Sequence, residues 1–382
     1  MKKYFTYLLK KNLLPLTFLT LFCIIVYVIP IWNQNYSFWN DNYFTYFAEH
    51  GFYPYLDLHY SKISLALGLI AVFIPILVFS YKMNKRSVDM HYSLPLSKTK
   101  VLISHFLVGL VLMYGAYTIA YLLGFLTIAL NVRHIHLIYY LWLYLASLIP
   151  AFILYSVTAF VYTRANTRKD GIISVIGAIC LFALVYSLVD NLASSNFPNA
   201  NLAFGEGSLF PFRVLYVVSE KLGDAIKNGK VEYWFSSTSK TVILDDAFIL
   251  IGAILWTLLS AGATAGLILM EKKSKAENVG QISESIFCYK LQIPAYTTIL
   301  IATVLTIGGG MFIFFLIIFM AFIMTIVYRR TIKIGNKEAI ILCSSIMASV
   351  IIYSIVYLIG KELYPPEEID SSTVSMIKNC LF

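Results

Sequence analysis

The chain is dominated by long runs of apolar residues, and these runs limit what it can fold into. Apolar types make up 59% of the 382 residues and charged types 13%, whereas a soluble domain carries about a quarter charged residues. The apolar residues gather in runs of roughly 18–30 residues, the length of helix that crosses about 30 Å of hydrocarbon. The sequence therefore predicts an all-α fold, a polytopic bundle of transmembrane helices.

We expect about 8–9 membrane segments from the runs and their breaks. Their expected ranges are 13–31, 62–81, 101–130, 138–161, 171–189, 244–270, 295–308, 311–328 and 339–360. As one helix, 295–328 would be about 50 Å long. Since Gly308, Gly309 and Gly310 offer a break, we expect a tight hairpin or a re-entrant pair there. The first run has no small-residue cleavage site after it and is expected to be a retained span.

The distribution of basic residues predicts the orientation. With the N-terminus inside, 20 of the 29 lysines and arginines fall on inner segments, as the positive-inside rule requires. This topology makes 1–361 a transmembrane domain with outer loops at 32–61 and 191–243, an inner loop at 82–100 and a polar tail at 362–382. Anionic lipid, worth about 1 kcal/mol per nearby cation, accounts for the net charge of +9. We therefore expect a bilayer partner and no nucleic acid.

No constellation of residues predicts catalysis, a cofactor or a metal site on this chain. Gly223 to Val231 has five residues between its glycines, and Val231 replaces the Ser or Thr that holds magnesium in a phosphate loop. His134 and His136 lack a third ligand, so a zinc site is not expected. The predicted spans also lack the buried acids and bases of a proton relay. Energy for any transport should therefore come from elsewhere.

The inner loop at 82–100, KMNKRSVDMHYSLPLSKTK, is the most informative polar segment. Ser87 can cap a short helix that runs to about Ser93 and cannot continue through Pro95, and Ser97 can cap the next span. Lys98 and Lys100 then lie in the first turn of that span, where the helix dipole disfavours cations. Such a short helix between two spans is typical of a coupling element. An ordinary positive-inside loop is the alternative.

The segments Asp89–Leu102 and Ser104–Gly109 resemble a pattern in ABC-2-type transporter permeases of Gram-positive bacteria, in which an Asp and a Ser-Leu-Pro turn precede a basic pair and the third span. A second similar stretch is 276–281, followed by the apolar region through 308–310 and by 328–330. The resemblance covers roughly residues 1–360. Longer members continue into an outer domain and further spans, so we expect a short form or a truncated product.

The resemblance implies a permease subunit in the bacterial plasma membrane that pairs with a separate cytosolic ATPase and with a second permease chain, the same or related. ATP and magnesium would bind the partner ATPase, and this chain would not be an enzyme. The resemblance places the ATPase contact at Asp89, His91, Ser93, Leu94, Pro95, Ser97, Lys98 and Lys100. The amphipathic stretch 1–12 is expected to lie along the inner surface as a second contact element. Gly262 and Gly266 form a small-residue face for helix packing.

Three functional classes stay open. An exporting permease for an amphipathic or hydrophobic peptide or drug agrees with the apolar, aromatic-rich chain. A sensory or immunity protein would instead bind a peptide or lipid at the outer face, where 32–60 holds twelve aromatics and three acids. A membrane-embedded enzyme acting on lipids would need a paired acid, base or nucleophile, and the sequence offers none.

Overall fold

The computed structural model describes residues 2–32, 55–131, 137–196, 240–272, 277, 279–281, 283, 285–307, 311–329 and 335–363. Over this part of the chain every regular element is a helix, which confirms the predicted all-α class. Six helices there are long and apolar enough to cross a membrane. They are Leu13–Trp32, Lys98–Leu130, Tyr140–Thr163, Gly252–Glu271, Met311–Arg329 and Asn336–Ile355. The finer count of eight or nine spans stays a prediction.

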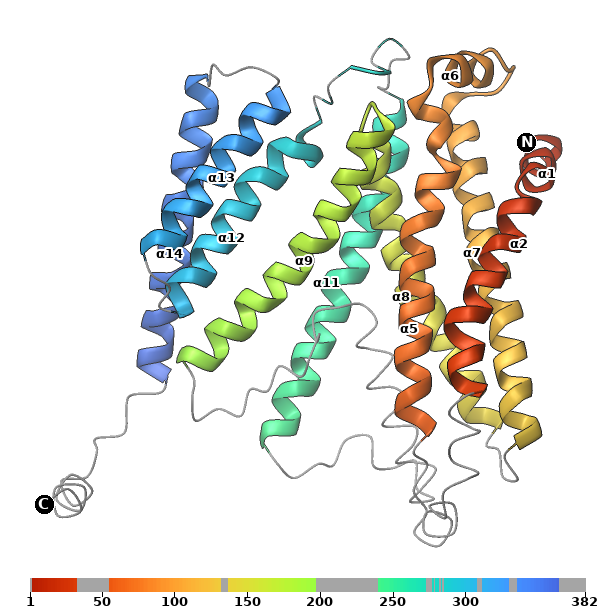
Figure 1. Cartoon of the computed structure of the whole chain (residues 1–382), viewed down its shortest axis with the longest axis horizontal. Coiled ribbons are helices and arrows are strands. Elements are labelled where there is room, and N and C mark those ends of the chain that lie inside the picture. Colours follow the sequence, from red (N-terminus) through yellow and green to blue (C-terminus); the bar gives the residue numbers. More distant parts are fainter. Residues whose placement is uncertain are drawn as a thin grey trace, which may run out of the picture. The chain divides into compact units, whose positions relative to one another are not determined.

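The helices form two compact units (Figure 1). Unit 1 comprises Met1–Phe182 and Gly207–Gln292, and unit 2 comprises Ala183–Glu206 and Ile293–Phe382. The elements of unit 1 are α1 (Lys2–Lys11), α2 (Leu13–Cys23), η1 (Ile24–Val28), α5 (Tyr55–Val78), η2 (Ser80–Met83), α6 (Lys85–Tyr92), α7 (Lys98–Asn131), α8 (Leu137–Thr163), the first part of α9 (Arg168–Asn196), α11 (Lys240–Glu271) and η5 (Ile286–Lys290). Unit 2 holds the rest of α9, nearly all of α12 (Leu291–Ile307), α13 (Met311–Arg329) and α14 (Asn336–Leu363).

The region 295–328 is divided between two helices, α12 and α13, which run in opposite directions in Figure 1. The expected break at Gly308, Gly309 and Gly310 lies outside the described residues. Helix α12 begins at Leu291, earlier than expected, and contains Pro294. Because a proline in the first helical turn removes only a donor that has no partner within the helix, Pro294 does not end α12.

Most of both outer loops, the His134–His136 loop and the polar tail after 363 also lie outside the described residues. Their predicted roles are therefore not addressed by the structure.

Close packing of α5, α7 and α8 forms the core of unit 1. The ring of Tyr155 is fully buried, and its hydroxyl donates a hydrogen bond of 3.0 Å to the Phe106 carbonyl. A Cβ on Gly109 would lie 2.1 Å from that hydroxyl oxygen and 3.2 Å from a methyl of Ile74. Glycine at 109 is therefore what lets α7 approach both neighbours.

The two glycines of the predicted small-residue face in α11 lie in different surroundings. A Cβ on Gly266 would lie 2.9 Å from the Phe160 ring of α8, whereas a Cβ on Gly262 would meet nothing within 4 Å. Gly266 thus lies at a helix contact within the chain. Gly262 faces open space.

Two polar contacts connect α14 to the other helices of unit 2. Thr297 of α12 donates a 2.9 Å hydrogen bond to the Ser345 hydroxyl of α14, and Arg329 pairs with Glu338 at 3.2 Å. Only 17% of the residues in the most apolar stretch of α13 are buried. An outward surface this apolar fits contact with lipid or with another membrane-embedded chain.

Replacing Gly109 with Ala should lower the free energy of unfolding by about 1–3 kcal/mol, because the added methyl group overlaps the buried Tyr155 hydroxyl. Gly262→Ala adds the same methyl group to open space and is the matched control. Thermal unfolding of both variants in detergent checks this. Equal midpoints for the two variants would contradict the packing described for α7.

Candidate functional site

The segment 82–100 forms a short helix, α6, between the apolar helices α5 and α7. It consists of the end of η2, helix α6, a turn at 93–97 and the start of α7. The predicted cap at Ser87 is wrong: α6 begins at Lys85, and the side chain of Asn84 accepts from the Arg86 amide at 3.2 Å. The predicted cap at Ser97 is confirmed, since its hydroxyl accepts from the Lys100 amide at 3.4 Å.

Helix α6 has an inner face and an outer face. Val88 and His91 are buried, at 2% exposure each. The exposed residues are Lys85, Arg86, Asp89 and Met90 of the helix, with Ser93, Pro95, Ser97, Lys98 and Lys100 after it. Leu94 is half-buried. Among the eight residues that the resemblance assigns to an ATPase contact, only His91 is buried. In such a contact, His91 would therefore position α6 and would not touch the partner.

The first anchor of α6 is His91. Its Nδ1 lies 3.0 Å from the hydroxyl of Tyr4 in α1. The same hydroxyl lies 3.1 Å from Nε2 of His105 in α7. The ring of Tyr81 stacks on His105 with centroids 4.0 Å apart and meets His91 edge-on at 4.9 Å. Four elements, α1, η2, α6 and α7, therefore converge on one buried aromatic cluster.

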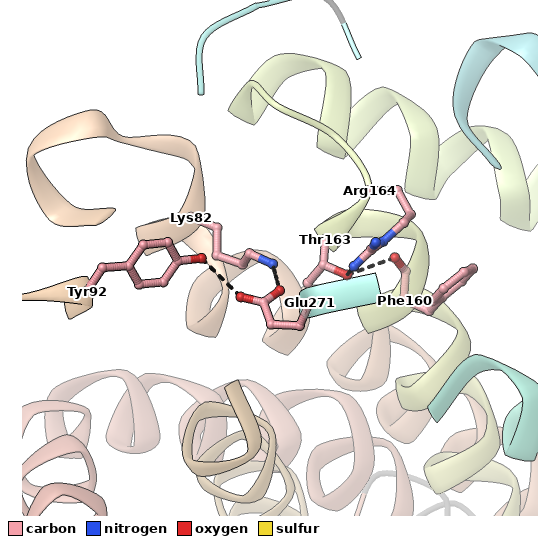
Figure 2. Close-up of polar contacts among 6 residues, drawn as sticks. All are labelled: Lys82, Tyr92, Phe160, Thr163, Arg164 and Glu271. Carbon is pink, nitrogen blue, oxygen red and sulfur yellow. Dashed lines mark hydrogen bonds and ion pairs between the residues drawn. The ribbon is translucent and has the colours of Figure 1, made fainter. Parts of the chain in front are cut away.

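The second anchor is Tyr92, the next residue along. Its hydroxyl donates a 3.0 Å hydrogen bond to Oε1 of Glu271, the last residue of α11. The other carboxylate oxygen of Glu271 pairs with the ammonium group of Lys82 in η2 (Figure 2). Glu271 has no exposed side-chain surface and Lys82 has 9%. The last turn of α6 is thus tied to α11 through a buried ion pair.

Two further cations lie close to this ion pair. Arg164, which follows α8, is close enough that the Glu271 carboxylate opposes the lowering of its pKa by burial. Figure 2 shows it beside Thr163 and over the ring of Phe160, whose centroid lies 5.4 Å from the guanidinium carbon. Lys98 lies over the ring of Tyr92, 4.8 Å from its centroid. Burial lowers the pKa of Lys82, and the carboxylate again opposes the shift.

Two polar contacts join Gly280 and Ser283 to the turn between α8 and α9. The Gly280 amide donates to the Asn166 carbonyl at 2.9 Å, and the Ser283 hydroxyl donates to the Arg164 carbonyl at 2.8 Å. Gly280 has a φ of +86°, a conformation that glycine adopts without steric cost. This region includes the end of the stretch 276–281 that entered the resemblance.

These contacts bring four predicted inner segments of unit 1 to one end of the unit: the N-terminal helix, 82–100, 164–169 and 272–290. Figure 1 shows α1, α6 and the α8–α9 turn at that end. In the predicted topology, an even number of membrane spans separates each of these segments from the next, which would place all four on the same side of the membrane.

Sequence reasoning missed the partners of the loop. Glu271 lies one residue beyond the expected span 244–270, and Tyr4 belongs to the amphipathic stretch 1–12. The available signal was His105, an ionisable residue one turn inside an otherwise apolar helix. The contacts join residues 87 to 189 positions apart, and no local pattern encodes such a pairing. Among the described residues, no three His, Cys, Asp or Glu side chains group as metal ligands.

No protein-family model, curated protein or solved structure matches the chain. The assignment of a function therefore depends on the site itself.

Removing one partner of the Lys82–Glu271 pair should cost about 3–5 kcal/mol, because it leaves the other charge buried alone. Glu271→Leu and Lys82→Met are each expected to lower the thermal unfolding midpoint strongly in detergent. The double variant should lose less than the sum of the two. Additive losses would show that the two groups are not coupled.

The Arg329–Glu338 pair provides the control, since its side chains are 37% and 31% exposed. The corresponding cycle with Arg329→Met and Glu338→Leu should give a coupling within about 1 kcal/mol of zero.

Proposed function

We propose that the chain is the permease subunit of an ATP-binding cassette transporter of the bacterial plasma membrane, with α6 as the element that contacts a separate cytosolic ATPase. The observation that carries this proposal is the construction of α6. It is a short helix between the apolar helices α5 and α7, exposed on one face and fastened on the other by His91 and Tyr92.

The two anchors, His91 and Tyr92, suit a helix that transmits a conformational change to its neighbours. Tyr92 connects α6 to the end of α11, and His91 connects it to α1 and α7. A displacement of α6 would therefore reach α1 and α11 as well as α7, the next helix in the sequence. A loop that serves only as a topology signal has no need of buried polar partners.

The energetics agree with such a role. Moving a two-state membrane domain from 1:99 to 99:1 needs about 5.5 kcal/mol of differential binding. Exposed ion pairs contribute about 0–1 kcal/mol each, whereas breaking a buried ion pair costs about 3–5 kcal/mol. The buried anchors can therefore stay intact while the exposed contacts of α6 form and break.

The charge of the exposed face indicates the partner's chemistry. Lys85, Arg86, Lys98 and Lys100 are exposed around Asp89 and Met90. A complementary ATPase surface would be mainly acidic, with a basic group facing Asp89 and an apolar hollow for Met90. ATP and magnesium would bind that partner.

In the proposed orientation, the end of unit 1 that holds α1, α6 and the α8–α9 turn lies in the cytosol. The inner segments carry 20 of the 29 basic residues, and the contacts described above hold four of those segments together. The bilayer, and a second permease chain against exposed apolar helix surface, complete the expected partners. The proposed cargo is an amphipathic or hydrophobic peptide or drug moved outward.

Reversing the charge of Lys98 together with Lys100 should reduce recovery of the ATPase with a tagged chain at least several-fold, since both cations are exposed on the docking surface. Asp89→Lys should act in the same direction. Recovery is measured by affinity purification in mild detergent, with membrane insertion monitored in parallel.

Lys272→Glu with Lys337→Glu makes the same change in charge at exposed residues outside 82–100, and should leave recovery unchanged. If the Lys98 and Lys100 variant also retains the ATPase, the loop is only a topology signal. If the unaltered chain recovers no ATPase, the permease proposal fails in favour of a non-transporting sensor or immunity protein.

A further inference from the structure

One hydroxyl group, that of Tyr4, joins the N-terminal helix to both α6 and α7. It lies 3.0 Å from Nδ1 of His91 and 3.1 Å from Nε2 of His105. Both histidines are buried, at 2% and 5% exposure, and their ring centroids lie 5.4 Å apart. Leu8 of the same helix is also buried, at 1%. Helix α1 is therefore docked on protein through the face that holds Tyr4 and Leu8.

Tyr4 can bond both histidines only by donating to one ring and accepting from the other, and either histidine can be the acceptor. Burial raises the pKa of Tyr4 to about 12, so its hydroxyl carries its hydrogen throughout the physiological range. That hydrogen is donated to one imidazole nitrogen, and the hydroxyl oxygen accepts the N–H of the other ring. One ring must therefore present a bare nitrogen to Tyr4, which only a neutral imidazole does.

A proton on the accepting ring destroys this pattern. Both rings then offer an N–H to the oxygen, and the hydrogen of Tyr4 loses its acceptor. The new positive charge would also be buried, facing Tyr4 and Lys11 from α1, Tyr81 from η2 and the other histidine. Lys82 of η2 adds a further positive charge near His105. Burial, and secondly Lys11, lower the pKa of His91.

We propose that Tyr4 is a positioning residue that holds α1 against α6 only while the histidine that accepts its hydrogen, His91 or His105, is neutral, so that acid on the side of the membrane carrying α6 releases α1. The contact would work as a proton-sensitive latch on the same short helix that we assign to ATPase docking. Its consequence for the ATPase depends on the proposed function, whereas the latch itself does not.

The direction of the effect follows from linkage. A histidine whose pKa is lower in the latched state than in the released state stabilises the latch above its ordinary pKa of about 6.5 and loses that stabilisation as the pH falls. The latch should be closed at about pH 7.5 and open at about pH 5.

The test measures the distance between spin labels on Lys3 of α1 and Arg86 of α6, both exposed. The full chain, with its five cysteines replaced by alanine, is reconstituted in lipid nanodiscs without any ATPase. Pulsed electron paramagnetic resonance should give a narrow distance distribution at about pH 7.5 and a broad or longer one at about pH 5. A second label pair on Lys100 and Lys169 reports on the fold of unit 1 and should not change.

Two variants separate protonation from general weakening. His91→Asn with His105→Gln keeps an amide group near each bonding nitrogen but cannot take up a proton, so the distribution should stay narrow at both pH values. Tyr4→Phe keeps the ring and removes the hydroxyl, so a broad component should be present already at about pH 7.5. Overturning results are an unchanged distance in the unaltered chain at about pH 5, the same acid response in the double variant, or a narrow distribution in Tyr4→Phe.

Failure of this test leaves the ATPase recovery experiment unaffected, because the nanodisc sample contains no ATPase. Likewise, a chain that recovers no ATPase can still show the acid-dependent distance change.

Discussion

Glu271 is a carboxylate with no exposed side-chain surface, and a buried charge persists only where partners compensate its lost hydration. Lys82 and Tyr92 supply those partners from η2 and α6. Through these contacts, the end of α11 is held against η2 and against the last turn of α6. His91, which precedes Tyr92, ties α6 to α1 and α7. The position of α6 therefore depends on a few buried polar contacts.

Apolar run lengths were sufficient to predict the helices, because membrane crossing demands a continuous apolar stretch of defined length. The two-helix division of 295–328 followed from the same length argument. The predicted N-cap of α6 at Ser87 was wrong because Asn84 and Ser87 are both good capping residues. Local preference alone does not choose between them. The anchors could not be predicted, since Tyr4, Lys82 and Glu271 find their partners only after the helices pack.

The predicted ATPase contact now divides into residues with two different tasks. Asp89, Lys98 and Lys100 are exposed, whereas His91 is buried and bonds to Tyr4 of α1. Met90, at 52% exposure, adds an apolar group to this exposed surface that the resemblance did not assign. Under the proposed function, such a loop would carry a large free-energy change into the membrane domain without chemistry of its own.

The proposed function places the outer face of α6 in contact with a cytosolic ATPase. A photo-crosslinking amino acid placed at Met90 in cells tests this contact, with the same probe at buried Val88 as control. We expect position 90 to capture a protein with a nucleotide-binding phosphate loop and position 88 to capture none. Capture of no ATPase from position 90, or equal capture from both positions, would contradict it.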